Sequence, residues 1–263
     1  KQKTAYEISL GLVGSEMCIR DSFRASHNSN PRRILYALRD LYTHLPRPRT
    51  FNHGSMIMRI LVKGITIRHL AFALEALVSE DDVQIHIITE EPEIGLSQSL
   101  QPGSKMDSHP ILKILVRHFP RDVDMNTFVR GMWISRALGI ESAERGALIH
   151  LRSSLILITD KTFQIVGAGQ KSIDPIIFDY EYDPEFNESE KWFGASFSCP
   201  CSEKNCLPRG DGTCEQWSRK PIQKTTALET STWFGDDPFE AVSVELEKGI
   251  ADAREYLQSP KYS

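Results

Sequence analysis

A short turn between an apolar run and an amphipathic run holds residues suited to binding a charged ligand. It reads Gly64-Ile-Thr66-Ile-Arg-His69, where Gly64 can end a strand and Thr66 offers a hydroxyl group. If a helix begins here, its first backbone N–H groups have no partners within the helix and attract anions. A threonine hydroxyl can add a hydrogen bond to a phosphate group. The turn therefore predicts an anion site at the start of a helix.

The segments on both sides of this turn predict a strand, a helix and a second strand. The first run, residues 58–62, is apolar, and the second strand ends in Thr89-Glu90-Glu91. This order is typical of the opening unit of a nucleotide-binding α/β domain, where an acidic residue follows the second strand. The helix would place Leu70, Ala73, Leu74 and Leu77 on one face, and the second strand alternates through Val83, Ile85 and Ile87.

A second group of polar residues lies near the end of the chain. Gly235-Asp236-Asp237-Pro238 precedes residues 241–257, which have a helical pattern. Taken alone, these four residues are a turn and a helix cap.

Four cysteines gather in one stretch, and three interpretations of them stay open. Cys199, Cys201, Cys206 and Cys214 could bind zinc, although their spacing is not the paired Cys-x2-Cys of a zinc ribbon. Two disulfides, or reduced cysteines in a loop, are the alternatives. We therefore assign no metal.

The composition narrows the class of partner. The 263-residue chain has a formal net charge of −4, which gives no reason to expect a nucleic acid. No run approaches the roughly 20 apolar residues that a membrane helix needs. We expect a soluble protein, and the sequence does not specify an oligomeric state.

The first 55 residues are expected to stand apart from the domain. Residues 1–22 resemble a translated sequencing adapter and are expected to have no function. Residues 23–55 are rich in arginine and are either translated upstream sequence or an organelle transit peptide. We favour the first, because Met56 or Met58 directly precedes the first strand, and this favours the cytoplasm over an organelle.

The middle of the chain predicts a mixture of elements. We expect a polar surface loop over residues 95–109, and residues 110–118 fit a short helix or a strand. A helix is predicted over 124–138, capped by Asp124 or Asn126. Strands are predicted over 147–159, 162–166 and 173–182, joined by turns at 160–161 and 167–171.

In this order the elements resemble those of FAD-dependent oxidoreductases, the type that includes aromatic hydroxylases, flavin halogenases, lycopene cyclases and geranylgeranyl reductases. The landmarks are the opening unit, the helix over 124–138 before a meander, a returning strand at 172–179, and Thr232–Glu240, which is similar to the family's Gly-Asp loop. The resemblance implies an α/β fold with a Rossmann-like, mostly parallel sheet and a β-meander. Residues 56–183 and 232–263 would form the FAD-binding domain, and residues 184–231 a small Cys-rich insertion.

The resemblance also implies where FAD would bind. The family's Gly-x-Gly-x-x-Gly turn is here Gly64, Thr66 and His69, which would lie at the pyrophosphate. The acid that holds the ribose aligns with Thr89, one residue before Glu90. Gly235 and Asp236 would contact the ribityl and pyrophosphate region. The flavin ring itself performs the redox chemistry, so no catalytic side chain is named.

The implied function is hydroxylation, halogenation or reduction of a small organic substrate, as in a flavin monooxygenase or another oxidoreductase. A degenerate, non-catalytic binding module of the same fold is the first alternative. A third interpretation comes from Phe178-Asp-Tyr-Glu-Tyr182 and the cysteines, which resemble the end of a SET-domain lysine methyltransferase and its zinc-binding segment.

Overall fold

The structure, a computed structural model, describes residues 57–95, 101–120, 126–167, 174–185, 190–200, 206–223 and 226–259. All of them belong to one of the chain's two units, residues 46–263. The expectations for residues 1–55, for Asp124 and for Cys201 lie outside the described residues. Among the described helices, none is both long and apolar enough to span a membrane.

A parallel sheet of four strands organises this unit. Strands β1 (Met58–Lys63), β2 (Val83–Ile88), β5 (Leu148–His150) and β9 (Tyr180–Tyr182) lie in the order β5-β2-β1-β9. Helix α3 (Ile67–Ser79) joins β1 to β2, so the predicted opening unit is confirmed.

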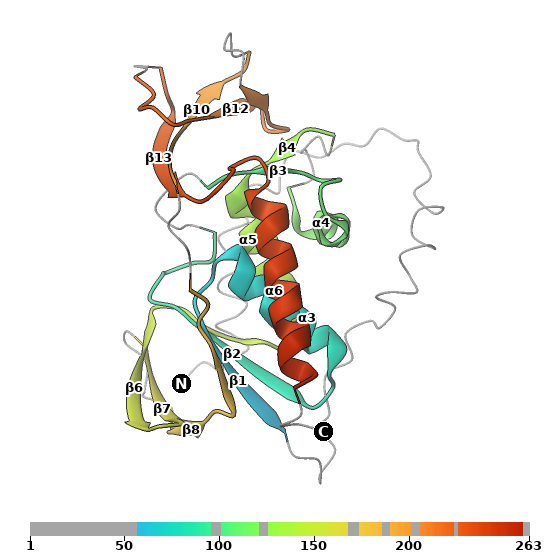
Figure 1. The fold of residues 1–263 in the computed structure, drawn as a ribbon, viewed down its shortest axis with the longest axis vertical. Helices are drawn as coiled ribbons and strands as arrows, with labels where there is room; N and C mark the ends of the chain where they lie inside the picture. The colour runs from blue at the N-terminus through green and yellow to red at the C-terminus, as the bar shows by residue number, and fades with distance from the viewer. Residues whose placement is uncertain are drawn as a thin grey trace, which may run out of the picture. The chain divides into compact units, whose positions relative to one another are not determined.

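Helices cover one face of this sheet. Helix α6 (Ala241–Leu257), whose bounds agree with the prediction, lies along α3, and α5 (Gly131–Glu144) packs on α3 as well (Figure 1). The two backbones of α3 and α6 meet at Gly249, where a Cβ atom would lie 2.4 Å from the Arg68 carbonyl oxygen. The buried core on this face includes Ile60, Val62, Ile85, Ile87, Leu70, Phe72, Ile134, Leu246 and Ile250.

A three-stranded antiparallel meander covers the opposite face. It consists of β6 (Ser153–Thr159), β7 (Thr162–Gly167) and β8 (Ile176–Ile177). Phe163, Ile165 and Phe178 pack on Leu61 and Ile88 of the sheet. Each inner strand therefore has apolar residues on both faces, as expected of a parallel sheet between two layers. The predicted meander is confirmed.

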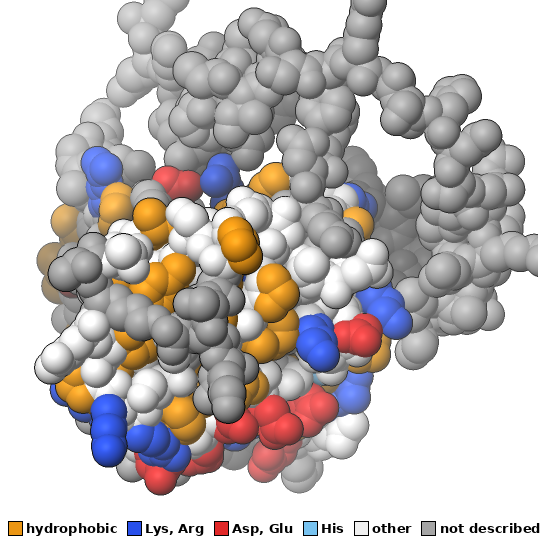
Figure 2. All heavy atoms as spheres, turned by 90° about the horizontal axis from the view of Figure 1, so that it is seen from above, with side chains coloured by type: hydrophobic (Ala, Val, Ile, Leu, Met, Phe, Trp, Pro, Cys, Tyr) orange, Lys and Arg blue, Asp and Glu red, His pale blue; other side chains and the backbone are white. Residues whose placement is uncertain are grey.

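A separate antiparallel sheet was not predicted. Strands β10 (Lys191–Ser198), β11 (Leu207–Pro208), β12 (Thr213–Ser218) and β13 (Glu229–Phe234) lie in the order β11-β12-β10-β13. Figure 2 shows hydrophobic side chains on the face of the molecule seen from above. Phe234 at the end of β13 is exposed, and so is Leu228, which directly precedes this strand. Much of the stretch predicted as a Cys-rich excursion is thus a sheet.

Three predicted elements differ from the structure: two predicted strands are each divided between two sheets, and one predicted helix begins later. The run over 147–159 forms β5 and β6, with a bend at Arg152, and the run over 173–182 forms β8 and β9. The helix predicted from residue 124 begins only at Gly131, since Phe128 and Val129 form β4 and pair with β3 (Ser104–Lys105). Its N-cap is Arg130, so Asn126 does not cap it.

The segment predicted as a surface loop is partly buried over residues 101–109. Pro102, Gly103, Ser104 and Met106 are buried, and Ser104 belongs to β3. The ambiguous residues 110–118 are helical, as α4 (Pro110–Leu115) and the 3-10 turn η3 (Val116–His118). Composition alone misled here, because non-local pairing with β4 buries this polar segment.

Candidate functional site

Gly64 ends β1 in a conformation that favours glycine. Its φ is +141°, and a Cβ atom there would lie 2.7 Å from Cε1 of the His69 ring. A larger residue would have to displace this ring, which is 3% exposed. The turn therefore requires glycine at residue 64 and contains an imidazole where the related fingerprint has its third glycine.

The His69 ring is a hydrogen-bond partner of Thr66. Burial lowers the pKa of His69 to about 4, with a smaller effect from the Arg68 charge, so the ring is neutral at pH 7. The ring hydrogen-bonds to the backbone of Lys63, and its Nδ1 lies 2.7 Å from Thr66 Oγ1. Which of the two groups donates depends on the ring nitrogen that carries the hydrogen. The Thr66 hydroxyl, which was predicted to face a phosphate, thus already has a hydrogen-bond partner in His69.

The N-terminal ends of α3 and α6 point toward the same end of the helix pair (Figure 1). Arg68, in the first turn of α3, donates to Asp252 of α6. Glu75, further along α3, accepts from Arg254, which is further along α6. The two helices therefore run in the same general direction. Ala241 lies about two turns before Gly249, which puts the start of α6 roughly 12 Å beyond the start of α3. The Gly64 turn and the loop before α6 are therefore at one end of the pair.

That loop is built against tryptophan rings. The Gly235 carbonyl accepts from Trp192 Nε1 at 3.1 Å, and a Cβ atom on Gly235 would lie 2.2 Å from Cη2 of Trp233. Asp237 accepts from the Phe239 backbone at 2.9 Å and shapes the entry to α6. Asp236 is exposed. Asp237 is exposed as well, so both aspartates present their side chains to solvent.

Gly235→Ala should displace the Trp233 ring and lower the free energy of unfolding by about 1–3 kcal/mol. Urea unfolding followed by tryptophan fluorescence measures this loss. Gly212→Ala is the matched control, because Gly212 has a φ of +77° but nothing within 4 Å of its Cβ position. Equal losses in both variants would mean that backbone conformation, and not the ring contact, determines the cost.

Glu90 follows β2 and lines an open hollow of about 700 Å³. The neighbouring Thr89 is buried, and its hydroxyl accepts from the Glu91 backbone at 3.1 Å. Of these two residues, Glu90 is therefore the one that can offer a side chain to a ligand. The hollow is lined by Glu90, Pro92, Arg152, Ser153, Ser154, Val166 and Gly167.

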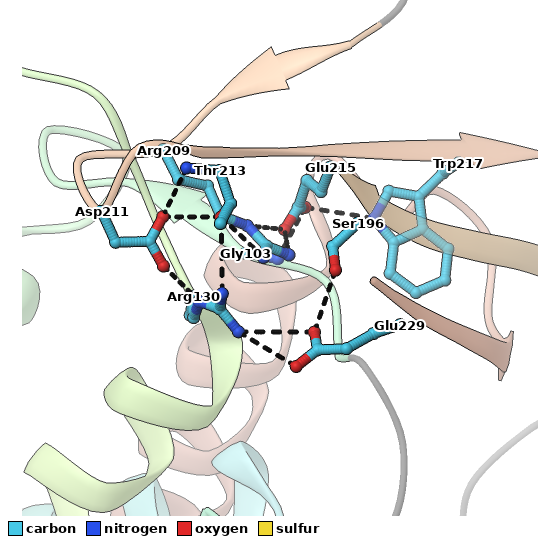
Figure 3. Close-up of polar contacts among 9 residues, drawn as sticks. All are labelled: Gly103, Arg130, Ser196, Arg209, Asp211, Thr213, Glu215, Trp217 and Glu229. Atoms are coloured by element: carbon cyan, nitrogen blue, oxygen red, sulfur yellow. Dashed lines mark hydrogen bonds and ion pairs between the residues drawn. The ribbon is translucent and has the colours of Figure 1, made fainter. Parts of the chain in front are cut away.

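A polar network in the antiparallel sheet was missed by the sequence analysis (Figure 3). The buried Glu215 accepts from Arg209, from the Gly103 backbone at 3.0 Å and from Trp217 Nε1 at 3.1 Å. Arg130, at the start of α5, pairs with Asp211 at 2.5 Å and with Glu229 at 3.3 Å.

This network fastens the antiparallel sheet to β3 and α5. Burial alone would raise the pKa of Asp211, but the Thr213 hydroxyl and the Arg130 guanidinium hold it below its usual value. Each carboxylate in the network is hydrogen-bonded or ion-paired to an arginine or a hydroxyl group. We therefore assign the network a structural role. No local signal reveals it, because its members are scattered between residues 103 and 229.

A histidine and two glutamates form another cluster, between η3 and α5. One ligand atom each of His118, Glu141 and Glu144 lie within 4.8 Å of one another. However, Arg117 donates to both glutamates and Arg145 donates to Glu141. Although burial would raise it, hydrogen bonds from His118, Arg145 and Arg117 lower the pKa of Glu141 to about 2. Two cations already neutralise the carboxylates, so we assign no metal to this cluster.

The cysteines match none of the three interpretations in full. Cys206 is disulfide-bonded, whereas Cys199 is an exposed thiol and Cys214 a buried one. Cys206 therefore cannot act as a thiolate ligand in this state.

No protein-family model matches this chain, and no curated protein matches it. Among solved structures, it is similar to a flavoprotein/dehydrogenase from Cytophaga hutchinsonii, with a TM-score of 0.50 and 11% identity over 77% of this chain and 79% of that one. It is also similar to CabE, an aromatic hydroxylase from angucycline biosynthesis, with a TM-score of 0.42 and 14% identity over 68% of this chain. A third is BexE, with a TM-score of 0.47 and 13% identity over 75% of this chain.

These likenesses concern the fold. The chain covers only 52% of the length of CabE and 61% of that of BexE. The match to the Cytophaga hutchinsonii protein shows that this chain shares the fold of that protein, and the fold here is a mixed α/β structure with a parallel sheet and antiparallel sheets. The predicted fold class is confirmed at this level.

Proposed function

We propose that this chain is the nucleotide-binding part of a FAD-dependent oxidoreductase that acts on a small organic substrate. The observation that carries the proposal is the common direction of α3 and α6, which brings the Gly64 turn and the Asp236 loop to one end of the helix pair within a flavoprotein fold. Two helix N-termini directed to one region favour an anionic ligand.

The residues present fit FAD at three points. Gly64 keeps the required backbone conformation, and the first N–H groups of α3 would face the pyrophosphate. Glu90 would accept from the hydroxyls of the adenosine ribose, and Asp236 would do so at the ribityl chain. When bound, FAD supplies electron transfer at its flavin ring, while this chain binds and orients it.

One contact favours the non-catalytic alternative. Because the Thr66 hydroxyl is already hydrogen-bonded to His69, the helix start offers the pyrophosphate mainly its backbone N–H groups. A binding module that keeps the fold but holds a nucleotide weakly would show this arrangement. The methyltransferase alternative gains no support, since its zinc segment needs thiolates and Cys206 is disulfide-bonded.

Flavin uptake by the full chain tests the proposal. The purified protein should be yellow or should take up added FAD, and Asp236→Ala should weaken FAD binding about tenfold, because a charge-assisted hydrogen bond is lost. Asp160→Ala, in the exposed turn between β6 and β7, is the control and should bind FAD as the unmodified chain does. A colourless protein that takes up no added FAD would contradict the oxidoreductase proposal.

A further inference from the structure

Arg152 has an unusual backbone conformation at the rim of the Glu90 hollow. Its φ is +49°, and it is the only residue other than glycine that has a positive φ in the part of the chain that the structure describes. For a residue with a long side chain this left-handed conformation is costly. Such outliers gather at ligand sites, where the surrounding structure holds them in place.

The backbone holds Arg152 beside Glu90. The Arg152 N–H donates to the Glu91 carbonyl at 3.0 Å, and the next N–H, that of Ser153, donates to the Thr89 carbonyl at 2.9 Å. These two bonds clamp the bend between β5 and β6 to the residues on either side of Glu90. Both side chains line the same hollow.

The two charges in this hollow have no ion-pair partners among the described residues, and they do not pair with each other. Arg152 and Glu90 are exposed, and neither takes part in a side-chain hydrogen bond or salt bridge in that part of the chain. Pro92 and Val166 add apolar surface to the same wall. A ligand that fits must offer hydroxyl groups to the carboxylate and a flat, electron-rich surface to the guanidinium.

We propose that Arg152 is a ligand-contacting residue that stacks its guanidinium on the base of an adenine nucleotide whose ribose hydroxyls bind Glu90. A planar guanidinium stacks on aromatic rings, and Pro92 or Val166 can contact the other side of the base. A phosphate on the 2′-hydroxyl is disfavoured, because the Glu90 carboxylate would repel it. The inference rests on the proposed function and adds the residue that recognises the base.

Titration calorimetry of the full chain with AMP, which carries no flavin, tests this inference. AMP should bind, and Arg152→Ala should weaken its binding about threefold to tenfold. Arg152→Lys keeps the charge but not the plane, so it should be nearly as weak. Adenosine 2′,5′-bisphosphate should bind no more tightly than AMP. Removing the 2′-hydroxyl from AMP should weaken binding to the unmodified chain but not to Glu90→Ala, which has no acceptor for that hydroxyl.

Arg152→Gly separates ligand binding from stability. Glycine tolerates the left-handed conformation, so this variant should keep or raise the thermal unfolding midpoint while losing AMP affinity. No AMP binding, unchanged AMP binding in Arg152→Gly, or tighter binding of the bisphosphate would each overturn the inference. AMP binding without FAD uptake would instead overturn the proposed function and leave this inference standing.

Discussion

Replacing Glu215 with alanine should lower the free energy of unfolding by about 3–5 kcal/mol, because an uncompensated charge would remain buried. The Arg209 side chain is fully buried and Glu215 is 1% exposed. Arg209 Nε lies 2.8 Å from the Glu215 carboxylate, and a second guanidinium nitrogen donates to the same oxygen. The alanine variant would leave this guanidinium, the Gly103 N–H and the Trp217 indole N–H without their acceptor.

Urea unfolding followed by circular dichroism measures the loss. Glu229→Ala is the matched control. Glu229 lies in the same sheet as Glu215 and pairs with Arg130, but its side chain is 47% exposed. Exposed pairs contribute about 0–1 kcal/mol. A double variant, Arg209→Met with Glu215→Leu, should recover part of the loss because no buried charge remains. Similar losses in Glu215→Ala and Glu229→Ala would show that burial of the Arg209 pair does not determine the effect.

Acidification from pH 7 to pH 5 should destabilise the fold by about 4 kcal/mol through two histidines. Burial lowers the pKa of His69 to about 4, and burial lowers that of His86 to about 4, with smaller effects from His150 and Arg59. His86 stacks on His150, with 3.1 Å between Nδ1 and Nε2, so a proton on one ring would disfavour a proton on the other.

The folded and the unfolded chain take up protons in different pH ranges, and this determines the direction in which stability changes with pH. Below the ordinary histidine pKa of 6.5 the unfolded chain takes up protons, while both folded rings stay neutral until about pH 4. Stability is therefore complete above pH 6.5 and falls between pH 6.5 and pH 4, by about 2 kcal/mol per ring at pH 5. The pKa of Glu141 is lowered to about 2, so the stability that its charge contributes is lost only as the pH falls from about 4.5 toward 2. It changes the stability little above pH 5.

Urea unfolding at several pH values measures this dependence. His86→Phe should remove about half of the pH slope, because the variant has one titrating ring fewer. A stability that stays constant from pH 7 to pH 5, or a slope unchanged in His86→Phe, would contradict the assignment.

The sequence predicted those elements whose formation depends on a pattern of neighbouring residues. The apolar spacing of α3 and α6 is continuous over several turns, and both helices lie where their periodicity predicts. By contrast, β3 and β4 are two residues long, and only their pairing across the chain makes them strands. The bend at Arg152 was also unpredictable, since arginine does not signal a left-handed residue.

The candidate site shows the same division. Glycines at residues 64 and 235 and the acid at residue 90 follow from turn and strand chemistry, and the structure explains each of them by a close contact or by exposure. The hydrogen bond between Thr66 and the buried His69 ring depends on the folded turn and could not be read from residue types. The burial of the pair between Arg209 and Glu215 depends on a sheet that the sequence did not reveal.

The pairing of α3 with α6 has a consequence for synthesis. Helix α3 keeps part of its apolar surface uncovered until Leu246, Ile250 and Ala253 have left the ribosome, about 170 residues later. Until then the nascent chain exposes an apolar surface, and closure of so long a loop makes the final docking step slow. Translation that stops before residue 241 would therefore release a chain prone to aggregate, whereas the last helix converts it into a stable domain.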